Sequence, residues 1–421
     1  MKKLLLLCLS IYGVHPMQAQ HCGSPVIENQ IQAKDPDFNL RREQIEQFTE
    51  HYLQHAEQAK GTRATIYRIP VVVHVIHNGQ SIGTGANISN NQVYSQIAIL
   101  NKDYRKKNTD SLATSHAFYS TTADCEIEFC LAGTDPSGNY TSGIDRVNGG
   151  LSSYDYTDMD GFVKQNTIWD RDRYLNIWVA PLGGSASSIL GYATPPGSPS
   201  DVDGVVVGTT YFGNVGNVSA PYNKGRTATH EIGHFLNLRH IWGDNFCGND
   251  FVSDTQPAED ANYGCPSFPY NANNSCGAGV NGEMYMNYMD YTDDACMRMF
   301  TTGQKNRMRA VLASGGSRNS LTTSNTCNWP TAIQEVQEKS FKLFPNPANG
   351  HFYIQGQGNF ESDTKVLIYN TFGQSVNSLV EIQPETPNRY YLETGNLLSG
   401  TYYVQVVSGN QSFTHPFTIV H

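Results

Sequence analysis

Charged residues are scarce in this sequence, and basic residues are the scarcer kind. Only 16% of the 421 residues are charged, and 28 Lys and Arg stand against 38 Asp and Glu, which gives a net charge of -10. This deficit of positive charge argues against nucleic acid as the main partner and is compatible with binding of cations, including calcium. The hydrophobic content of 39%, with 24 Tyr and 38 Gly, excludes a disordered chain and indicates a globular protein of about two or three domains, rich in strands and loops.

The sequence also lacks an apolar run long enough to span a bilayer. Its N-terminal apolar stretch, residues 4–9, follows two lysines and precedes a plausible cleavage zone that ends near Ala19 and Gln20. A basic start and a short apolar core are typical of a signal peptide, which we assign to residues 1–20. The sequence therefore predicts an exported protein with no transmembrane segment.

No Cys-x-x-Cys pair occurs in the Cys-rich part of the chain, which argues against a zinc ribbon there. Cys8 leaves with the signal peptide, and outside the cell several of the other cysteines are expected to form disulfides. Four cysteines lie in one irregular region and allow three pairings: Cys247, Cys265, Cys276 and Cys296. The partners of Cys125, Cys130 and Cys327 are left undetermined.

What the sequence does contain is a metal-binding pattern, HEIGHFLNLRH, at residues 230–240. The residues around its start include no helix breaker after Gly225, so we expect a helix, on which residues four apart share one face. His230 and His234 can therefore bind one ion. Glu231 lies one step round the helix, close enough to act as a general base on water.

His240 can join the first two histidines only if the helix ends and the chain turns. Such a turn needs a residue that tolerates positive φ, and Asn237 is placed to supply it. The complete string resembles the long zinc motif of the metzincin metalloproteases, HExxHxxGxxH, with Asn237 in the Gly position. Residues 225–229 and 240–244 resemble the pappalysin family, including its ulilysin-like bacterial members. A helix that carries two histidines by chance is the alternative.

This resemblance implies a metzincin-like α/β fold: a mixed twisted sheet, an active-site helix and a loop-rich C-terminal subdomain. Met289 matches the Met-turn methionine, which packs beneath the zinc ligands. Tyr291 matches a tyrosine whose hydroxyl approaches the reacting carbonyl, and an ordinary core aromatic is the alternative. Asp294 matches the residue at the base of a specificity pocket for Arg or Lys. The alternatives are that Asp293 has this role or that Asp294 lies on the surface.

The resemblance also implies the disulfides Cys247–Cys276 and Cys265–Cys296. It further implies a structural calcium site in the same region, because calcium prefers oxygen ligands and the loop is rich in them. The candidate ligands are Asp250, Asp254 and Thr255. Solvation of these side chains by water is the alternative.

The catalytic domain is assigned to residues 63–330. Its first strand is predicted over residues 68–77, which are nearly all apolar and therefore central in a sheet. His74 and His77 lie on this strand, where histidine is more often structural than a metal ligand. The other predicted elements are a helix over 92–104 and strands over 126–131, 174–180 and 203–208.

Residues 21–62 lie between the signal peptide and the catalytic domain, which indicates a propeptide. An amphipathic helix is predicted over residues 39–53. Cys22, which is followed by Gly23, resembles a cysteine switch, in which a thiolate occupies the open zinc position and displaces the water. A disulfide partner or an incidental cysteine is the alternative.

The chain changes character again at its C-terminal end. Residues 331–341 form a polar linker, and short strands with Gly and Asn turns over 342–421 predict a small all-β sandwich. The strings FPNPANG, YNTFGQ and LLSGTYYVQV resemble the C-terminal sorting domain of the type IX secretion pathway of Bacteroidetes. This resemblance implies contact with the secretion machinery, although the chain lacks the basic tail that often ends the family. A carbohydrate- or protein-binding sandwich is the alternative.

The function expected from these patterns is that of a secreted or surface-attached zinc endopeptidase that cuts proteins or peptides before Arg or Lys. Such an enzyme would release its own propeptide at the Thr62–Arg63 bond, with Tyr67–Arg68 as the alternative bond. A surface-attached binding protein with an inactive zinc helix is the competing hypothesis, and a zinc hydrolase of small esters is a third. The intact ligand set and Glu231 argue against the binding protein.

Overall fold

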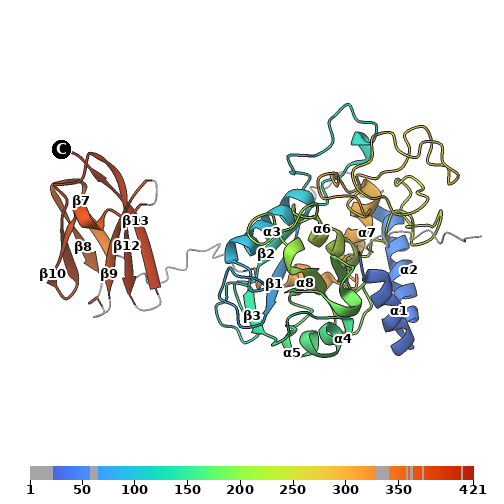
Figure 1. Cartoon of the computed structure of the whole chain (residues 1–421), viewed down its shortest axis with the longest axis horizontal. Coiled ribbons are helices and arrows are strands. Elements are labelled where there is room, and N and C mark those ends of the chain that lie inside the picture. The colour runs from blue at the N-terminus through green and yellow to red at the C-terminus, as the bar shows by residue number, and fades with distance from the viewer. Residues whose placement is uncertain are drawn as a thin grey trace, which may run out of the picture. The chain divides into compact units, whose positions relative to one another are not determined.

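A computed structural model describes residues 22–56, 65–327, 341–356, 359–360, 364–371, 374–408 and 411–421. The chain divides into two compact units, one up to residue 329 and one from residue 330 (Figure 1). The predicted signal peptide, the Thr62–Arg63 bond and all but the last residue of the predicted linker lie outside the described residues. The predicted domain boundaries at these places therefore stay predictions.

A six-stranded mixed sheet forms the centre of the first unit. Its strands are β1 (Tyr67–His77), β2 (Ile127–Leu131), β3 (Ile144–Asn148), β4 (Leu175–Ala180), β5 (Gly191–Ala193) and β6 (Val205–Gly208). They are ordered β2-β1-β4-β6-β5, and β3 pairs with the second half of β1. All pairs are parallel except β5–β6, so β5 is an antiparallel strand at the edge. The sequence did not predict the short strands β3 and β5.

Both faces of this sheet are buried, which explains the unbroken apolar run of β1. On one face, Val71 and Val73 belong to a core cluster that also includes residues of α3 (Asn90–Asp103) and α6 (Arg226–Phe235). On the other face, Trp178 belongs to a second cluster. The elements on this second face include α4 (Tyr156–Asp158), the π-helix η2 (Met159–Val163) and α5 (Lys164–Thr167), whose Thr167 hydroxyl accepts a hydrogen bond from Trp178.

Two helices precede β1, and both pack on the first unit. They are α1 (Ser24–Lys34) and α2 (Phe38–Ala56), of which only α2 was predicted. Ile27 and Ile31, one helical turn apart on α1, join the second core cluster, while α2 lies beside α7 (Thr302–Leu312) (Figure 1). Before α1, the amide of Gly23 donates to the carbonyl of Gly191 on β5 at 2.9 Å. The segment 22–56, called the prosegment below after the propeptide predicted for this part of the chain, thus passes along the free edge of the sheet.

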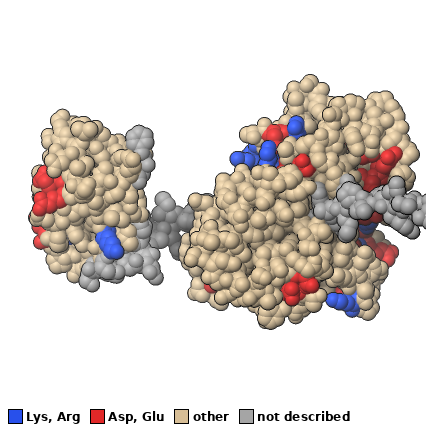
Figure 2. All heavy atoms as spheres, in the orientation of Figure 1, with Lys and Arg blue, Asp and Glu red and all other residues tan. Residues whose placement is uncertain are grey.

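The remaining helical segments of the first unit are short. They are α8 (Asn319–Thr323) and the 3-10 turns η1 (Tyr119–Thr121), η3 (Gly184–Ala186) and η4 (Thr209–Tyr211). Figure 2 shows one face of the molecule, on which small groups of Lys, Arg, Asp and Glu are scattered among uncharged residues. Within the described ranges, no helix has both the length and the apolar character needed to cross a membrane.

The second unit is an all-β sandwich with an extra 3-10 turn, η5 (Asn377–Leu379). Its strands are β7 (Phe341–Asn349), β8 (His351–Gly356), β9 (Lys365–Asn370), β10 (Glu381–Thr386), β11 (Arg389–Glu393), β12 (Gly400–Ser408) and β13 (Gln411–Ile419), in the order β10-β11-β8-β7-β13-β12-β9. Side chains on β8 alternate between buried and half-buried, as a sandwich strand requires. Pro345 and Pro347 lie where the register of β7 shifts, since proline cannot donate to a ladder.

Candidate active site

The pattern HEIGHFLNLRH begins on α6, whose residues are all buried. The helix ends at Phe235 because the chain turns at Asn237, whose φ of 75° lies in the left-handed region. This is the turn that the sequence predicted for Asn237. It brings His240 back against His230 and His234, which lie one helical turn apart on the same face.

The three histidines converge through their Nε2 atoms. The distances between these atoms in His230, His234 and His240 are 3.0, 3.1 and 3.2 Å. Each Nδ1 faces an oxygen that accepts a hydrogen bond: the carbonyl of Tyr288, the carbonyl of Leu238 and the carboxylate of Asp244. The Nδ1 atoms therefore carry the protons, and three Nε2 lone pairs point at one another.

Three convergent lone pairs repel one another unless a cation lies between them. Neutral imidazoles held in this tautomer are the form in which histidine binds zinc. Burial, helped by the neighbouring His240, lowers the pKa of His234 to about 3, which keeps this ring neutral. The donor set thus fits zinc, and it leaves a fourth position free for another ligand.

The Met-turn supports the site from below α6. Met289 is fully buried, and a Cβ on Gly233 would lie 2.4 Å from its Sδ, so a larger residue at position 233 would require the Met289 side chain to move. The amide of Met289 donates to Asn287 Oδ1 at 2.9 Å, which fixes the turn. The carbonyl of the preceding Tyr288 orients His230. These contacts are those of packing and orientation rather than ligation.

Glu231 lies beside the histidines and is 1% exposed. Its Oε2 accepts hydrogen bonds from Ser24 Oγ at 3.0 Å and from Cys22 Sγ at 3.3 Å, both from the prosegment. Burial raises the pKa of Glu231 to about 8. The prosegment therefore covers this carboxyl group, which lies next to the histidines where a general base would act.

Cys22 is the residue of the prosegment that reaches the histidines. Its Sγ and the three imidazoles supply ligand atoms that all lie within 4.8 Å of one another, which places the thiol at the fourth corner of the cluster. Burial and the nearby Glu231 carboxylate raise the pKa of the Cys22 thiol when no cation is bound. The structure thus brings together the four residues that the sequence analysis assigned to the zinc ion.

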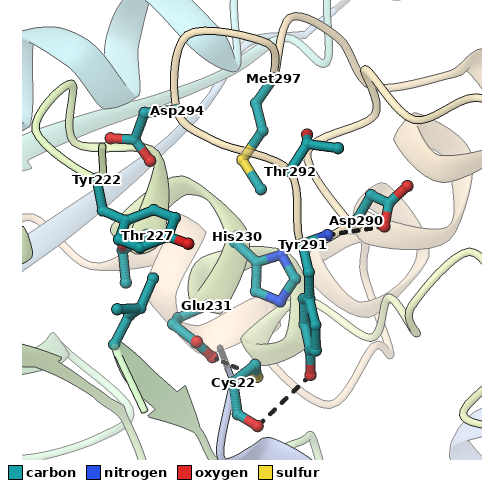
Figure 3. Close-up of a pocket in the computed structure, with 11 residues that line it drawn as sticks. Cys22, Tyr222, Thr227, His230, Glu231, Asp290, Tyr291, Thr292, Asp294 and Met297 are labelled. Carbon is teal, nitrogen blue, oxygen red and sulfur yellow. Dashed lines mark hydrogen bonds between the residues drawn. The ribbon is translucent and has the colours of Figure 1, made fainter. Parts of the chain in front are cut away.

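A narrow pocket lies beside the histidines, and Cys22, Glu231 and Asp294 are among the residues that line it (Figure 3). Its enclosed volume of about 20 Å³ holds roughly one water molecule while the prosegment is in place. Tyr291 forms one wall, and its hydroxyl donates to the carbonyl of Cys22 at 3.5 Å. Burial raises the pKa of Tyr291, so the phenol keeps its proton and remains a donor.

Asp294 lies in this pocket at the end opposite to Cys22, and it is 1% exposed (Figure 3). Its Oδ2 accepts the backbone amides of Lys224 at 2.7 Å and Arg226 at 3.2 Å, which fix the carboxylate. Burial raises the pKa of Asp294 to about 6. The adjacent Asp293 does not line the pocket, so the position of Asp294 agrees with the predicted specificity residue.

The loops after α6 are joined by disulfides. The structure pairs Cys247 with Cys276 and Cys265 with Cys296, the same two pairs that the resemblance implied. A third disulfide joins Cys130 on β2 to Cys327. Cys125 is buried and unpaired with any other cysteine.

The proposed calcium ligands are engaged with other protein groups. Asp250 accepts hydrogen bonds from the Thr255 hydroxyl at 2.8 Å and from an amide at 3.0 Å. Asp254 accepts from Thr301 Oγ1 at 2.6 Å and from Gly303 N at 2.9 Å, at the start of α7. Among the described residues, the metal-ligating group of three or more His, Cys, Asp or Glu is the one at the histidines. The calcium site therefore stays a prediction.

His74 is structural, as the sequence favoured. Its Nδ1 and Nε2 lie 2.9 Å from Asp145 Oδ2 and from Asn176 Oδ1, and its ring stacks on Trp178. These contacts use both ring nitrogens. His77 on the same strand is also absent from the metal-ligating group of the described residues.

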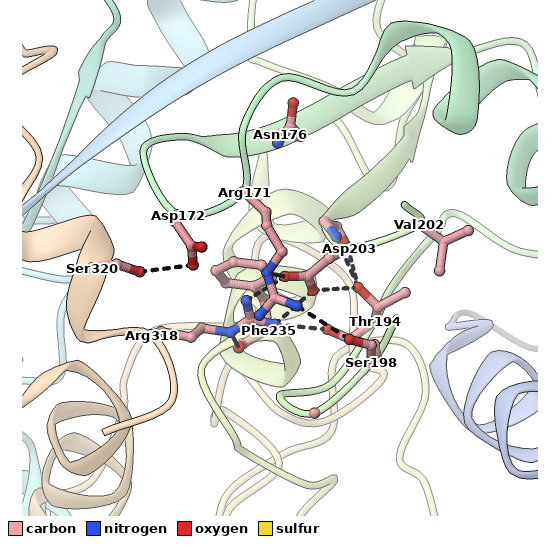
Figure 4. Close-up of polar contacts among 12 residues, drawn as sticks. Arg171, Asp172, Asn176, Thr194, Ser198, Val202, Asp203, Phe235, Arg318 and Ser320 are labelled. Carbon is pink, nitrogen blue, oxygen red and sulfur yellow. Dashed lines mark hydrogen bonds and ion pairs between the residues drawn. The ribbon is translucent and has the colours of Figure 1, made fainter. Parts of the chain in front are cut away.

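Sequence analysis missed two residues that position the zinc helix and its ligands. Asp244, which orients His240, lies four residues after it, and a search for carboxylates near each histidine would have found it. Arg318 is far away in the sequence, yet its Nε donates to the Phe235 carbonyl at the end of α6 at 2.7 Å (Figure 4). The same guanidinium donates to the buried Asp203 carboxylate at 2.8 and 2.9 Å. This ion pair joins the zinc helix to the loop that leads into β6.

Known proteins match both units. Residues 157–313 match the M43 peptidase family, described as pregnancy-associated plasma protein-A, and residues 342–420 match the secretion system C-terminal sorting domain. An extracellular metalloprotease of Colletotrichum graminicola is 30% identical over 257 residues, which are 59% of this chain and 78% of that protein. An extracellular metalloprotease of Arthroderma benhamiae is 32% identical over 250 residues, which are 57% of this chain and 75% of that protein.

Solved structures extend the match to the fold. Mature mirolysin of Tannerella forsythia, in complex with a cleaved peptide, is 44% identical with a TM-score of 0.57 and covers 62% of this chain and 97% of its own. A promirolysin point mutant from the same organism is 40% identical with a TM-score of 0.63 and covers 72% of this chain and 97% of its own. The metzincin fold and the export of the protein to the exterior or the cell surface are thereby confirmed. This chain belongs to the M43, or pappalysin, family of secreted metalloendopeptidases, and it ends in a type IX sorting domain.

Proposed function

We propose that this enzyme hydrolyses polypeptides at bonds that precede Arg or Lys, with Glu231 as the general base. The observation that carries the proposal is that three groups lie together: the three convergent histidines, the Glu231 carboxyl next to them, and a pocket lined by Asp294. Figure 3 shows His230, Glu231 and Asp294 around this pocket. The first two are the parts of a metal-assisted hydrolase, and the third adds a preference for a cationic side chain.

His230, His234 and His240 would hold the zinc ion. Zinc bound there supplies a Lewis acid for the scissile carbonyl and a lowered pKa for water. Glu231 accepts the proton of the attacking water and then donates it to the leaving amine. The Tyr291 hydroxyl donates to the carbonyl oxygen as negative charge develops on it. The contact of this hydroxyl with the peptide carbonyl of Cys22 supports that role.

Asp294 would select the residue after the scissile bond. The carboxylate is buried and fixed by two backbone amides, so the charge of a Lys or Arg side chain would be its natural partner in the pocket. With the prosegment in place the pocket is too small for such a side chain. We therefore expect this preference in the processed enzyme.

The experiment that tests this function is digestion of a mixed protein substrate by the processed enzyme, with and without a metal chelator. New N-termini are read by mass spectrometry. Chelator-sensitive cuts that leave Arg or Lys at the new N-terminus are the expected result. Chelator-sensitive cuts at other bonds would support the assignment as a metalloprotease and contradict the proposed role of Asp294. No cuts, from an enzyme that holds zinc and lacks its prosegment, would favour the binding-protein hypothesis.

Cys22 would be the latency residue of the zymogen. Its thiol occupies the fourth corner of the cluster, and its hydrogen bond to Glu231 occupies the base at the same time. Both contacts have to be lost before a substrate can bind.

Replacement of Cys22 by Ala is expected to shorten the half-time of zymogen activation by about tenfold or more, because the sulfur ligand is lost while the rest of the prosegment remains. Cleavage of a fluorogenic peptide over time measures the half-time. Cys125→Ala is the matched control, since Cys125 is also buried and outside any disulfide, but far from the cluster. Equal half-times for the two variants would remove Cys22 from this role.

A structural calcium ion near Asp250 and Asp254 is a further proposal from the family resemblance. If it is present, a calcium-selective chelator should lower the Tm of the processed enzyme by several degrees, on the order of 1–2 kcal/mol for a domain of this size. Thermal unfolding with zinc retained checks this. An unchanged Tm would mean that the hydrogen bonds of the two carboxylates alone organise the loop.

The C-terminal sandwich would deliver the enzyme to the type IX secretion machinery. Its match to the sorting-domain family over residues 342–420 supports this role.

A further inference from the structure

The prosegment shares the hydrophobic core of the catalytic unit. Ile27 and Phe38 are 0% and 1% exposed, and both pack in the cluster that contains Tyr156 and Trp178. A cut between the prosegment and β1 removes none of these contacts. The cleaved prosegment would therefore stay bound, with Cys22 still at the histidines.

A second anchor lies on α2. Arg307 of α7 donates to both carboxylate oxygens of Glu46 at 2.9 Å, and Arg42 donates to Asn237 Oδ1 at 2.8 Å. Asn237 is the turn residue of the zinc motif. The first anchor, α1 with Cys22, and the second anchor, α2, are joined by the short junction at residues 35–37. Each anchor holds the other at a high effective concentration, so the pair binds far more tightly than either alone.

The junction between the two anchors is the accessible part of the prosegment. Residues 32–34 and 36–37 are exposed, and Pro36 prevents α1 from continuing into α2. The last turn of α1 also borders a hollow of about 290 Å³, to whose lining Lys34 and Asp201 contribute. The side chains of these residues are exposed, so the contacts that oppose local unwinding are mainly the backbone hydrogen bond from Asp35 to Ile31 and the ion pair of Asp35 with Arg41. Local unwinding of an exposed turn is what a protease needs.

Lys34, the last residue of α1, is the basic residue next to the junction. Arg41 is held by Asp35 and by the carbonyl of Gly197, and Arg42 by Asn237, whereas Lys34 has no ion pair among the described residues. We propose that the Ala33–Lys34 bond is a second activation site, which the processed enzyme itself cuts. This inference rests on the proposed preference for bonds before Arg or Lys.

The reaction is hydrolysis of one amide bond. Water supplies the hydroxyl of a new carboxyl group on Ala33 and a proton for the new amino group of Lys34. The cut separates the first anchor from the second. The fragment that ends at Ala33 keeps Cys22 and Ile27 but loses the effective concentration that α2 provided, and it dissociates from the histidines.

The test uses the full-length zymogen that carries Glu231→Gln and cannot process itself. Wild-type processed enzyme is added, and N-termini and size-exclusion profiles are followed over time. A new N-terminus at Lys34 is the expected result. Molecules cut only between the prosegment and β1 should still elute with the prosegment bound.

A second variant, Lys34→Gln in the otherwise wild-type zymogen, gives an activity readout. We expect a normal first cut, a prosegment that co-purifies with the enzyme, and gain of activity slowed by about tenfold or more. Lys102→Gln, at an exposed lysine near the end of α3, is the matched control.

A peptide library digested by the same enzyme separates the two proposals. If the enzyme cuts the library before Arg and Lys, but no Lys34 terminus forms or Lys34→Gln activates like the control, the second site is overturned and the proposed function stands. If the library shows no preference for basic residues, the proposed specificity fails, and the second site falls with it.

Discussion

Glu231→Gln is expected to lower kcat for peptide hydrolysis by about 10²- to 10⁴-fold, the range for loss of a general base. Gln keeps the shape of the side chain and can still contact water, but it cannot take up a proton. The zinc content should stay at its wild-type level, because the three histidines are oriented by oxygens other than those of Glu231. The variant is processed in trans by wild-type enzyme, which is then removed, and kcat is measured on a fluorogenic peptide.

Metal analysis and thermal unfolding on the same sample serve as internal controls for Glu231→Gln. Glu128→Gln on β2 is the comparison variant, since Glu128 pairs with Arg68 and Arg105 at a distance from the site. It should retain kcat within about twofold. A Glu231→Gln enzyme that holds zinc and cleaves at the wild-type rate would refute the assignment.

Asp294→Asn is expected to lower kcat/KM for substrates with Arg or Lys after the scissile bond by about 10²-fold, the loss when a buried charge pair is broken. The Asn carbonyl can still accept the two backbone amides that hold Asp294, so the pocket should keep its shape. The ratio of kcat/KM for peptides with Lys and with Leu at this position measures the change. Asp293→Asn is the matched control and should leave the ratio unchanged.

The same carboxyl group predicts a pH dependence of this ratio. Burial raises the pKa of Asp294 to about 6, so the group binds a proton and loses its charge below about pH 6 rather than below about pH 4. The preference for Lys over Leu should therefore fall as the pH drops through 6, and it should recover above that value. A ratio that is flat between pH 5 and about pH 8 and insensitive to Asp294→Asn would place specificity elsewhere.

Local spacing made much of the site predictable. His230 and His234 lie on one face because residues four apart on a helix always do, and Asn237 turns the chain because few other residues tolerate positive φ. Met289, Tyr291 and the two disulfides of the C-terminal loops came from a motif resemblance rather than from derivation. The long apolar run of β1 predicted a central strand because only a strand covered on both faces is apolar throughout.

Other features depended on contacts between distant parts of the chain. α1 is short and partly polar, and it is stable because Ile27 and Ile31 pack on the far face of the sheet, which the sequence does not indicate. β5 has only three residues, and it exists as a strand because β6 pairs with it. No local pattern links Arg318 to Phe235, or Cys130 to Cys327.

The sequence by itself determined the pattern on which the proposed chemistry depends: the three histidines, the glutamate beside the first of them, and the turn that lets the third histidine return. These follow from backbone geometry over about ten residues, which is the same in any fold. Only the tertiary structure decided which residues cover the site and which residues line the pocket beside it. Cys22 and Glu231 are 209 residues apart in the sequence, and Asp294 and Arg226 at the start of α6 are 68 residues apart, yet each pair is in contact. The packing of the sheet, the prosegment and the disulfide-bonded loops brings them together. Contacts at such separations are set by topology and burial, and these forces leave no local pattern in the sequence.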